Sequence, residues 1–294
     1  MTALEQKLEM WSRPLSDAQT QKCERAVREI RTAVARHHYL GAQMQAGVVQ
    51  VFAQGSYANN INVRDESDVD VCVYYTGSMI QEPSNAFAGT PALYQYDQLK
   101  KDVYSCLVTY FGQSAVKWGN KAFDIKATTN GGVEADVVPC FQYLNYNAPS
   151  PPVIGTALRP DQPATWISNY PVQQRILGEE KNKQTNWRYK RAARIIKKLN
   201  YEMIAAGAWK EDWTPSFFLE SATWNQTNYL FDGSLYVPMT KGLLSAFANS
   251  FGGDRSTWLE SNGIKLLFRQ DRPWSSQDLV SFANAGWRYL GLGS

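Results

Sequence analysis

The sequence predicts an α+β fold, in which a mixed β-sheet follows one long helix and precedes a helical lobe. Three observations support this prediction. An amphipathic pattern fills residues 16–38, strand-like apolar runs divided by turn residues continue to residue 143, and helical periodicity dominates after Trp187. We expect two domains, with the sheet and the N-terminal helix in residues 1–170 and the helical lobe in residues 171–294.

The first half of the chain carries most of the strand signals. Its long helix begins at Ser16, which forms a capping-box pattern with Gln19. Asn130-Gly131-Gly132 is typical of a hairpin turn. We expect a loop over residues 76–95 and then a helix with Leu99, Val103, Leu107 and Tyr110 on one side. The expected strands are residues 48–54, 68–75, 122–129 and 134–143.

The second half is mostly helical. Six prolines in residues 145–172 favour an ordered loop or linker. After Trp187, one apolar stripe runs along the next helix, and three cations fall roughly opposite it, namely Lys190, Arg194 and Lys197. Further helices are expected from Pro215, near residues 240–251, and over residues 275–290.

Composition excludes several classes of protein. The chain is 44% hydrophobic and 19% charged, which is ordinary for a soluble globular protein. It has no apolar run long enough for a membrane helix, and its charged N-terminus does not resemble a secretory signal. The four cysteines lie far apart without a CxxC pair, which argues against structural zinc and favours the cytoplasm.

Positive charge is local, because the net charge is only +3. Nine Lys and Arg residues, against two acids, lie between Arg175 and Lys198. Such a run is either a solvated helix face or a site for phosphates.

Two aspartates stand out inside the second expected strand. Asp68 and Asp70 share one strand face, with Cα atoms about 6.6 Å apart at ~3.3 Å per residue. Two anions this close tolerate each other when a divalent cation lies between them, and oxygen-only ligands favour Mg²⁺ or Mn²⁺. Asp136 is the candidate third ligand, Glu134 is the fallback, and Asp124 is expected to face solvent. The alternative is a strand end with exposed acids.

The segment before the aspartates makes the pattern more specific. Gly55 and Ser56 follow a mostly apolar strand. A glycine there lets the backbone approach a phosphate, and a serine hydroxyl with free N–H groups can hold it. A lone Gly-Ser is usually only a turn. Together with two acids 13 and 15 residues after the glycine and a third on a later strand, it predicts a nucleotide triphosphate beside a metal pair.

This combination resembles the polymerase-β-like nucleotidyltransferases, and the stretch from Gly55 to Val73 is similar to the bacterial cGAS/DncV-like branch, clade E. The resemblance covers almost the whole chain, including EADVVPCFQY, SNYP, KNKQTNWRYKRAARIIKKL and TPSFFLE. It implies a bilobed fold with a polymerase-β-like core and a helical C-terminal lobe. It also implies synthesis of cyclic dinucleotides, often containing uridine, as second messengers in anti-phage defence.

The resemblance assigns roles residue by residue. It implies that Asp68, Asp70 and Asp136 hold two Mg²⁺ or Mn²⁺ ions and act in catalysis. The residues implied to contact the nucleotide triphosphate are Gln54, Gly55, Ser56, Lys197 and Ser216.

Two further positions are implied to contact the base. Phe217 would stack on it, at a position where relatives often have Tyr. Asn169 matches a position where Asn accompanies pyrimidine choice, although an Asn before Tyr-Pro can also cap a turn. The chain departs from the family at Ile61, where Thr is common. It also lacks a Cys/His insertion, so we expect no DNA activator. The lack of a long apolar run gives the expectation of no membrane partner.

The expected reaction joins UTP with ATP, or other pyrimidine nucleoside triphosphates, into cyclic UMP-AMP or cyclic di-UMP for a downstream effector. One alternative is a nucleotidyltransferase that modifies an RNA, a protein or a small molecule. Another is a catalytically silent nucleic-acid- or protein-binding module, although such a module gains nothing from three clustered anions. We expect a monomer, and the glycine-containing tail WRYLGLGS leaves open conjugation through the C-terminus.

Overall fold

The computed structural model of the protein describes residues 1–64, 68–81, 94–126, 133–147, 152–210, 214–249 and 254–293. The chain divides into two compact units. The sheet unit consists of Ser16–Ala58 and Asp68–Pro171. The helical unit consists of Met1–Leu15, Asn59–Ser67 and Val172–Ser294, so the first residues group with the later helices.

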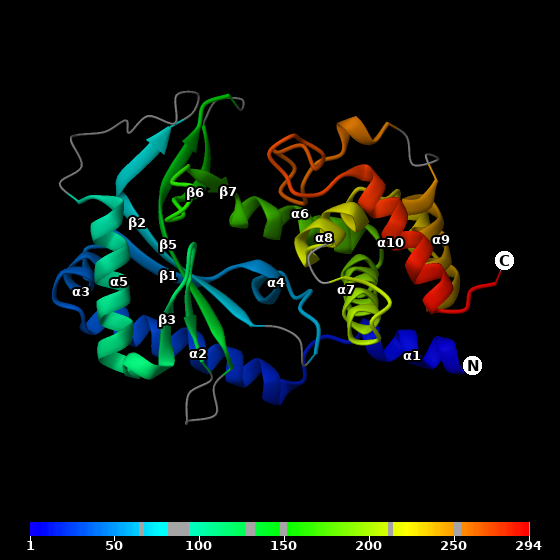
Figure 1. The fold of residues 1–294 in the computed structure, drawn as a ribbon, viewed down its shortest axis with the longest axis horizontal. Helices are drawn as coiled ribbons and strands as arrows, with labels where there is room; N and C mark the ends of the chain where they lie inside the picture. The colour runs from blue at the N-terminus through cyan, green and yellow to red at the C-terminus, as the bar shows by residue number, and fades with distance from the viewer. Residues whose placement is uncertain are drawn as a thin grey trace. The chain divides into compact units, whose positions relative to one another are not determined.

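A mixed seven-stranded sheet forms the centre of the sheet unit in the described part of the chain (Figure 1). Its main order is β1-β2-β5-β4-β3, and β6 and β7 extend it from β5. The β2–β5 pair is parallel and the other pairs are antiparallel. The strands are β1 Val49–Ala53, β2 Val69–Gln81, β3 Val116–Trp118, β4 Phe123–Ile125, β5 Ala135–Asn145, β6 Val153–Leu158 and β7 Ile167–Asn169.

One face of this sheet is covered by helix α5, Tyr96–Phe111. Its Tyr104 contacts Phe123 of β4, with ring centroids 5.5 Å apart. Phe123 is the cross-strand partner of Val137, which is in turn the partner of Val71, so these buried side chains share the α5 face. Side chains alternate along a strand, so the next residue on each strand points to the opposite face.

Three more helices complete the sheet unit in the described residues. Ser16 caps α2 through the Gln19 backbone N–H, and the Gln19 side chain accepts a hydrogen bond from the Ser16 N–H, as the sequence predicted. The one-turn α4 comes directly after β1 and contacts β2. The helices are α2 Asp17–Arg36, α3 His38–Gln45 and α4 Gly55–Ala58, and a 3₁₀ turn spans Gln113–Ala115.

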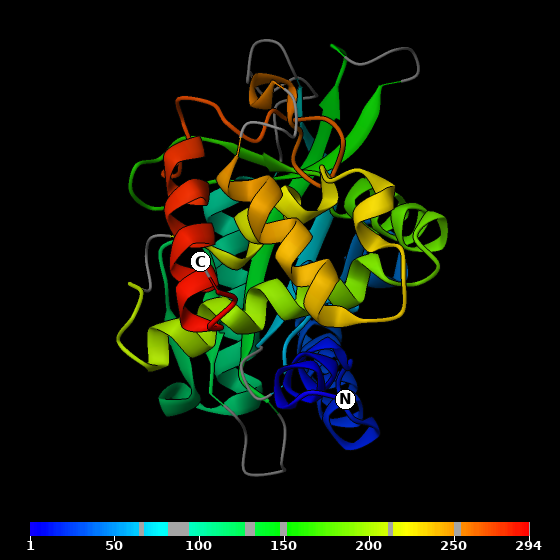
Figure 2. The ribbon, with the colours of Figure 1, turned by 90° about the vertical axis from the view of Figure 1, so that its right-hand side faces the viewer.

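Helix α7 forms the centre of the helical unit. Its apolar side chains, including Ile195, Ile196 and Leu199, are fully buried. It contacts α1, α8, α9 and α10 (Figure 2). The helices are α1 Ala3–Ser12, α6 Pro171–Gln184, α7 Tyr189–Ala205, α8 Ser216–Trp224, α9 Tyr236–Ala248 and α10 Ser276–Tyr289, with 3₁₀ turns at Asn228–Phe231 and Arg255–Thr257.

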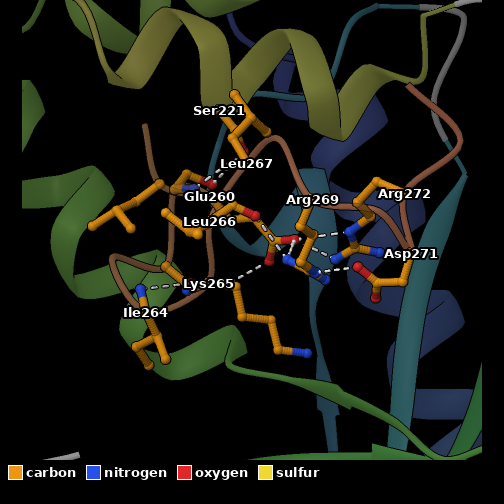
Figure 3. Close-up of polar contacts among 12 residues, drawn as sticks. Ser221, Glu260, Ile264, Lys265, Leu266, Leu267, Arg269, Asp271 and Arg272 are labelled. Carbon is orange, nitrogen blue, oxygen red and sulfur yellow. Dashed lines mark hydrogen bonds and ion pairs between the residues drawn. The ribbon is translucent and has the colours of Figure 1, made fainter. Parts of the chain in front are cut away.

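A buried carboxylate organises the segment between α9 and α10 (Figure 3). Glu260 is 1% exposed and accepts hydrogen bonds from Arg269 Nη1 at 2.7 Å and from Arg272 Nε at 3.0 Å. Asn262 Nδ2 donates to its other oxygen at 2.8 Å. Two guanidinium groups and one amide therefore compensate for the removal of this charge from water.

Several predictions require correction. The strand β2 continues to Gln81, so residues 76–81 are not a loop, and Asp68 precedes the strand rather than beginning it. Strands β6 and β7 lie within the expected proline-rich linker. Neither strand contains a proline, so each of their residues has a backbone N–H that can donate within the sheet. The sequence also did not indicate α6. The expected turn at residues 130–132 lies outside the described residues.

Three positive residues of α7 argue against one of the two alternatives for the basic run, the solvated helix face. Lys190 and Arg194 are each 4% exposed and Lys197 is 2% exposed, so they do not form a solvated face. Lys190 is paired with Glu179.

None of the described helices is long and apolar enough to cross a membrane.

Candidate active site

Asp70 and Asp136 are neighbours across the parallel β2–β5 pair. The register places their Cα atoms opposite each other, as it places Val71 opposite Val137. Because Val71 and Val137 face α5, the two aspartates point to the other face of the sheet. Two residues that lie 66 positions apart in sequence therefore place their carboxylates side by side.

Asp124 extends this pair to a third strand. It is the cross-strand partner of Asp136 on β4 and pairs with Lys117 at 3.4 Å. Its carboxylate is about half exposed, which agrees with the expectation that it faces solvent, but its position beside Asp136 was not foreseen. A hairpin centred on residue 130 places residue 124 opposite residue 136, so the Asn-Gly-Gly turn was the signal that could have found it.

The crowding of negative charge changes the acidity of these groups. The pKa of Asp136 is raised to about 6. Partial burial is the largest cause, and repulsion from the carboxylates of Asp124, Asp68 and Glu134 adds to it. Partial desolvation also raises the pKa of Asp68, with added repulsion from Glu134 and Asp124. Asp68 is the more exposed of the two, so water screens more of its repulsion. The raised pKa values thus reflect carboxylates held close together in partly buried positions.

Gly55 lies directly against this cluster. Its backbone has φ of +65°, and a Cβ atom built on it would lie 2.0 Å from Asp70 Oδ2. The preceding residue, Gln54, donates its backbone N–H to the Asp70 carbonyl at 2.9 Å. Only glycine satisfies both the left-handed backbone and the lack of space. The Gly55-Ser56 turn therefore lies on the aspartate face of the sheet.

Asn169 ends β7, two residues before α6 begins. Gly155 permits its position, because a Cβ there would lie 2.5 Å from the Asn169 carbonyl oxygen. The following residue, Tyr170, is buried and its hydroxyl accepts a hydrogen bond from Asn145 Nδ2 at 2.9 Å. These contacts fix the backbone at Asn169, while its side chain is half-buried and has no hydrogen-bond partner among the described residues.

The remaining candidates, Lys197, Ser216 and Phe217, lie in the helical unit. Lys197 is on α7, and Ser216 begins α8 with its hydroxyl 3.0 Å from that of Tyr201. Phe217 is partly buried and packs against the helical core, which leaves part of its ring exposed. The structure thus brings these three onto two contacting helices.

Two polar residues that the sequence did not indicate connect α7 to the start of α8. Thr214 Oγ1 donates to Asn200 Oδ1 at 2.8 Å, and Asn200 Nδ2 donates to the Thr214 carbonyl at 3.3 Å. Both side chains are buried. Asn200 lies one turn after Lys197 and Thr214 lies two residues before Ser216, so this pair fixes the two candidates relative to each other.

Glu220 is a second residue that the sequence did not indicate. It lies one turn after Ser216, is 4% exposed, and accepts hydrogen bonds from Gln174 Nε2 at 2.7 Å and Ser261 Oγ at 3.1 Å. Burial raises its pKa, and the nearby positive charge of Lys197 opposes that rise. Glu220 therefore supplies the negative charge that a buried lysine at position 197 requires.

Clustered carboxylates on one face of a mixed sheet, with a Gly-Ser turn directly beside them, are typical of a nucleotidyltransferase. The comparisons with known proteins support this class. A family model, the cGAS/DncV-like nucleotidyltransferase C-terminal helical domain, matches residues 177–291.

Full-length relatives identify the family. The chain is 33% identical to the cyclic dipyrimidine nucleotide synthase CdnE of Cecembia lonarensis, over 97% of this chain and 98% of that protein. It is 31% identical to the cyclic dipurine nucleotide synthase of Elizabethkingia meningoseptica, over 99% of each chain. The structure of the Rhodothermus marinus CdnE c-UMP-AMP synthase with Apcpp and Upnpp matches with a TM-score of 0.82 and 28% identity, over 99% of this chain and 98% of that one. The chain belongs to the cGAS/DncV-like nucleotidyltransferases and is an enzyme of that class.

Proposed function

We propose that this enzyme joins two nucleoside triphosphates into a cyclic dinucleotide with at least one pyrimidine base, such as cyclic UMP-AMP or cyclic di-UMP. The main supporting observation is the pairing of Asp70 with Asp136 beneath the Gly55 turn. The full-length similarity to proteins named as cyclic nucleotide synthases supports cyclisation over transfer to a separate acceptor.

The acidic cluster fits two Mg²⁺ or Mn²⁺ ions. Its donors are carboxylate oxygens only, which is the ligand chemistry these cations prefer. Partial burial and then the neighbouring carboxylates raise the pKa of Asp136, and a bound cation would favour its charged form. Within the described residues, no three acidic, histidine or cysteine side chains are gathered as a ready-made metal site. We assign the ions to Asp68, Asp70 and Asp136, with Asp124 adding negative potential beside them.

When bound, the ions would make a ribose hydroxyl more acidic and neutralise the triphosphate. The residues of the chain hold the nucleotide in position. Gly55 allows the backbone to come close to the phosphates, and Ser56 provides a hydroxyl beside them. Lys197 and Ser216 add a positive charge and a hydroxyl for the triphosphate, and Glu220 and the Asn200–Thr214 pair orient them. Phe217 provides a ring face for a base.

The proposed pyrimidine preference rests on Asn169. Its amide offers one donor and one acceptor, which can pair with a pyrimidine edge, and the backbone that carries it is fixed by its neighbours. Relatives of similar identity are named for dipyrimidine and dipurine products, so overall similarity does not decide the base. We therefore assign the choice of base to a local residue, Asn169.

The experiment that tests this proposal is mass spectrometry of products formed from each pair of nucleoside triphosphates with Mg²⁺ or Mn²⁺. The proposal predicts a cyclic product in mixtures containing UTP, and none with Asp70→Asn or Asp136→Asn. Cyclic products made only from ATP and GTP would overturn the base assignment but not the reaction.

We further propose that the product acts on a separate effector and that the enzyme acts in the cytoplasm as a monomer.

A further inference from the structure

A pocket of about 360 Å³ lies within the helical unit, outside the candidate active-site residues. It is lined by the end of α1, by Asn60, and by residues around the start of α7. None of Lys197, Ser216 and Phe217 lines it. Its volume is within the range of about 300–1,000 Å³ that is usual for small-molecule sites.

The pocket carries an excess of positive charge. Four cations line it, Arg13, Lys190, Arg191 and Arg194, and the single acid among the lining residues, Glu9, pairs with Arg13 at 3.1 Å. Lys190 is paired with Glu179 behind it. The two lining cations that remain are Arg191 and Arg194, which both lie on α7.

These two arginines have only neutral partners among the described residues. Arg191 Nη1 donates to the Tyr236 hydroxyl at 2.8 Å. Arg194 Nε donates to the Ser12 carbonyl at 2.7 Å, and its Nη1 donates to the carbonyl of Asn60. Burial lowers the pKa of Arg194 to about 10, and repulsion from Arg191 and Arg64 contributes. Two guanidinium groups one turn apart, without a carboxylate, favour an anion.

An exposed aromatic residue at this pocket is held in an unfavourable backbone conformation. Trp187 is 56% exposed and has φ of +64°, and Asn186 before it has φ of +48°. Its backbone N–H closes the end of α6 by donating to the Asn182 carbonyl at 2.7 Å. Glycine would make the same hydrogen bond without strain, so neither burial nor this bond explains the indole.

We propose that this pocket binds a phosphate-bearing nucleotide, with Arg191 and Arg194 on the phosphate and Trp187 stacked on the base. An indole face and a pair of guanidinium groups match the two chemical parts of that ligand. The pocket volume of about 360 Å³ fits one nucleotide rather than an RNA duplex, which would need an extended basic surface. The site is additional to the proposed catalytic site, and binding there does not require catalysis.

The test measures binding of AMP to the full chain by calorimetry in the presence of EDTA, so that no turnover occurs. Arg191→Gln is expected to weaken AMP binding by about tenfold or more, because it removes a charged hydrogen-bond donor. Lys241→Gln, at an exposed lysine of α9 outside the pocket, is the matched control and should bind as the wild type does. Ser216→Ala, which alters the candidate catalytic site, should also leave this binding unchanged.

A second variant separates a ligand-binding role of Trp187 from a structural one. Trp187→Gly relieves the left-handed strain, so its thermal midpoint should be unchanged or higher, while AMP binding weakens. A lower midpoint with unchanged AMP binding would show that the indole is structural. Equal AMP binding by wild type and Arg191→Gln, loss of binding only in Ser216→Ala, or binding of a 20-nucleotide RNA but not of AMP would each overturn the proposal.

Discussion

At the scale of single residues, the shape of the candidate site depends on the absence of a side chain at Gly55. Asp70 Oδ2 occupies the space that a Cβ atom would take. Such a contact cannot be relieved by the backbone alone, because φ of +65° is itself unfavourable for other residues.

Gly55→Ala is therefore expected to lower nucleotidyltransferase activity by on the order of a hundredfold, since displacement of Asp70 by about 1 Å disturbs the reacting geometry. Gly47→Ala is the matched control, because Gly47 has φ of +75° and open space around its Cβ position. It should cost about 1–2 kcal/mol of stability and retain activity. Activity assays and thermal unfolding of both variants check this, and an active Gly55→Ala enzyme would contradict it.

Asn169 is expected to act on base choice rather than on the rate of catalysis. Asn169→Ala should reduce the share of pyrimidine in the product by up to about tenfold, because one base-pairing amide is removed. The measurement is product composition by mass spectrometry with all four nucleoside triphosphates. Ser168→Ala, whose side chain points to the other face of β7, is the control. An unchanged product ratio in Asn169→Ala would leave Asn169 as part of the turn only.

At the scale of elements, three adjacent strands concentrate carboxylates on one face of the sheet. The pKa of Asp136 is raised to about 6 in the folded chain. Because Asp136 binds its proton more tightly in the folded chain, this group stabilises the fold at pH values below its unfolded pKa of about 4. That stabilisation is lost as the pH rises through the folded pKa of about 6.

The metal-free protein is therefore expected to lose thermal stability between about pH 4 and pH 6 through this group, and Mg²⁺ should restore more stability at pH 7.5 than at pH 5.5. Thermal unfolding with EDTA and with Mg²⁺ at both pH values measures this. Asp136→Asn should remove most of the difference. The same Mg²⁺ effect at both pH values in the wild-type protein would argue against metal binding at Asp136.

The segment between α9 and α10 depends on one carboxylate. Glu260→Ala leaves Arg269 and Arg272 without their buried partner and should cost about 3–5 kcal/mol of stability. Asp271→Ala removes an exposed partner of the same Arg269 and should cost less than about 1 kcal/mol (Figure 3). Denaturant unfolding compares the two, and similar losses would show that Glu260 does not organise this segment.

At the scale of the whole molecule, the sequence predicted the mixed sheet, the helical region and the family. Local signals were sufficient where the residues of a single element determine its structure, as for the capping box at Ser16. Local signals were insufficient where the pairing between strands determines the structure. The extension of β2 to Gln81 depends on hydrogen bonds to β5, and the position of Asp124 depends on the β4–β5 register.

Buried polar residues were the hardest part of the site to predict. Lys197 was proposed from the family resemblance, but nothing in its local pattern indicates that Glu220 balances its charge. Asn200 and Thr214 likewise look like ordinary polar residues until α7 and α8 pack together. Their roles arise from tertiary contacts, which a period or a motif does not encode.

The C-terminal tail is folded back in the described residues. Leu292 is buried, and the Trp287 indole donates to the Gly293 carbonyl at 2.6 Å. Conjugation through this tail stays a prediction, and it would require release of these two contacts.

The most direct test of the account is the fate of label from α-³²P nucleoside triphosphates incubated with the enzyme and Mg²⁺ or Mn²⁺. The account predicts a phosphatase-resistant small product with the mass of a cyclic dinucleotide, absent in Asp70→Asn. Label that appears only in phosphatase-sensitive linear products, or only on RNA or protein, would contradict it.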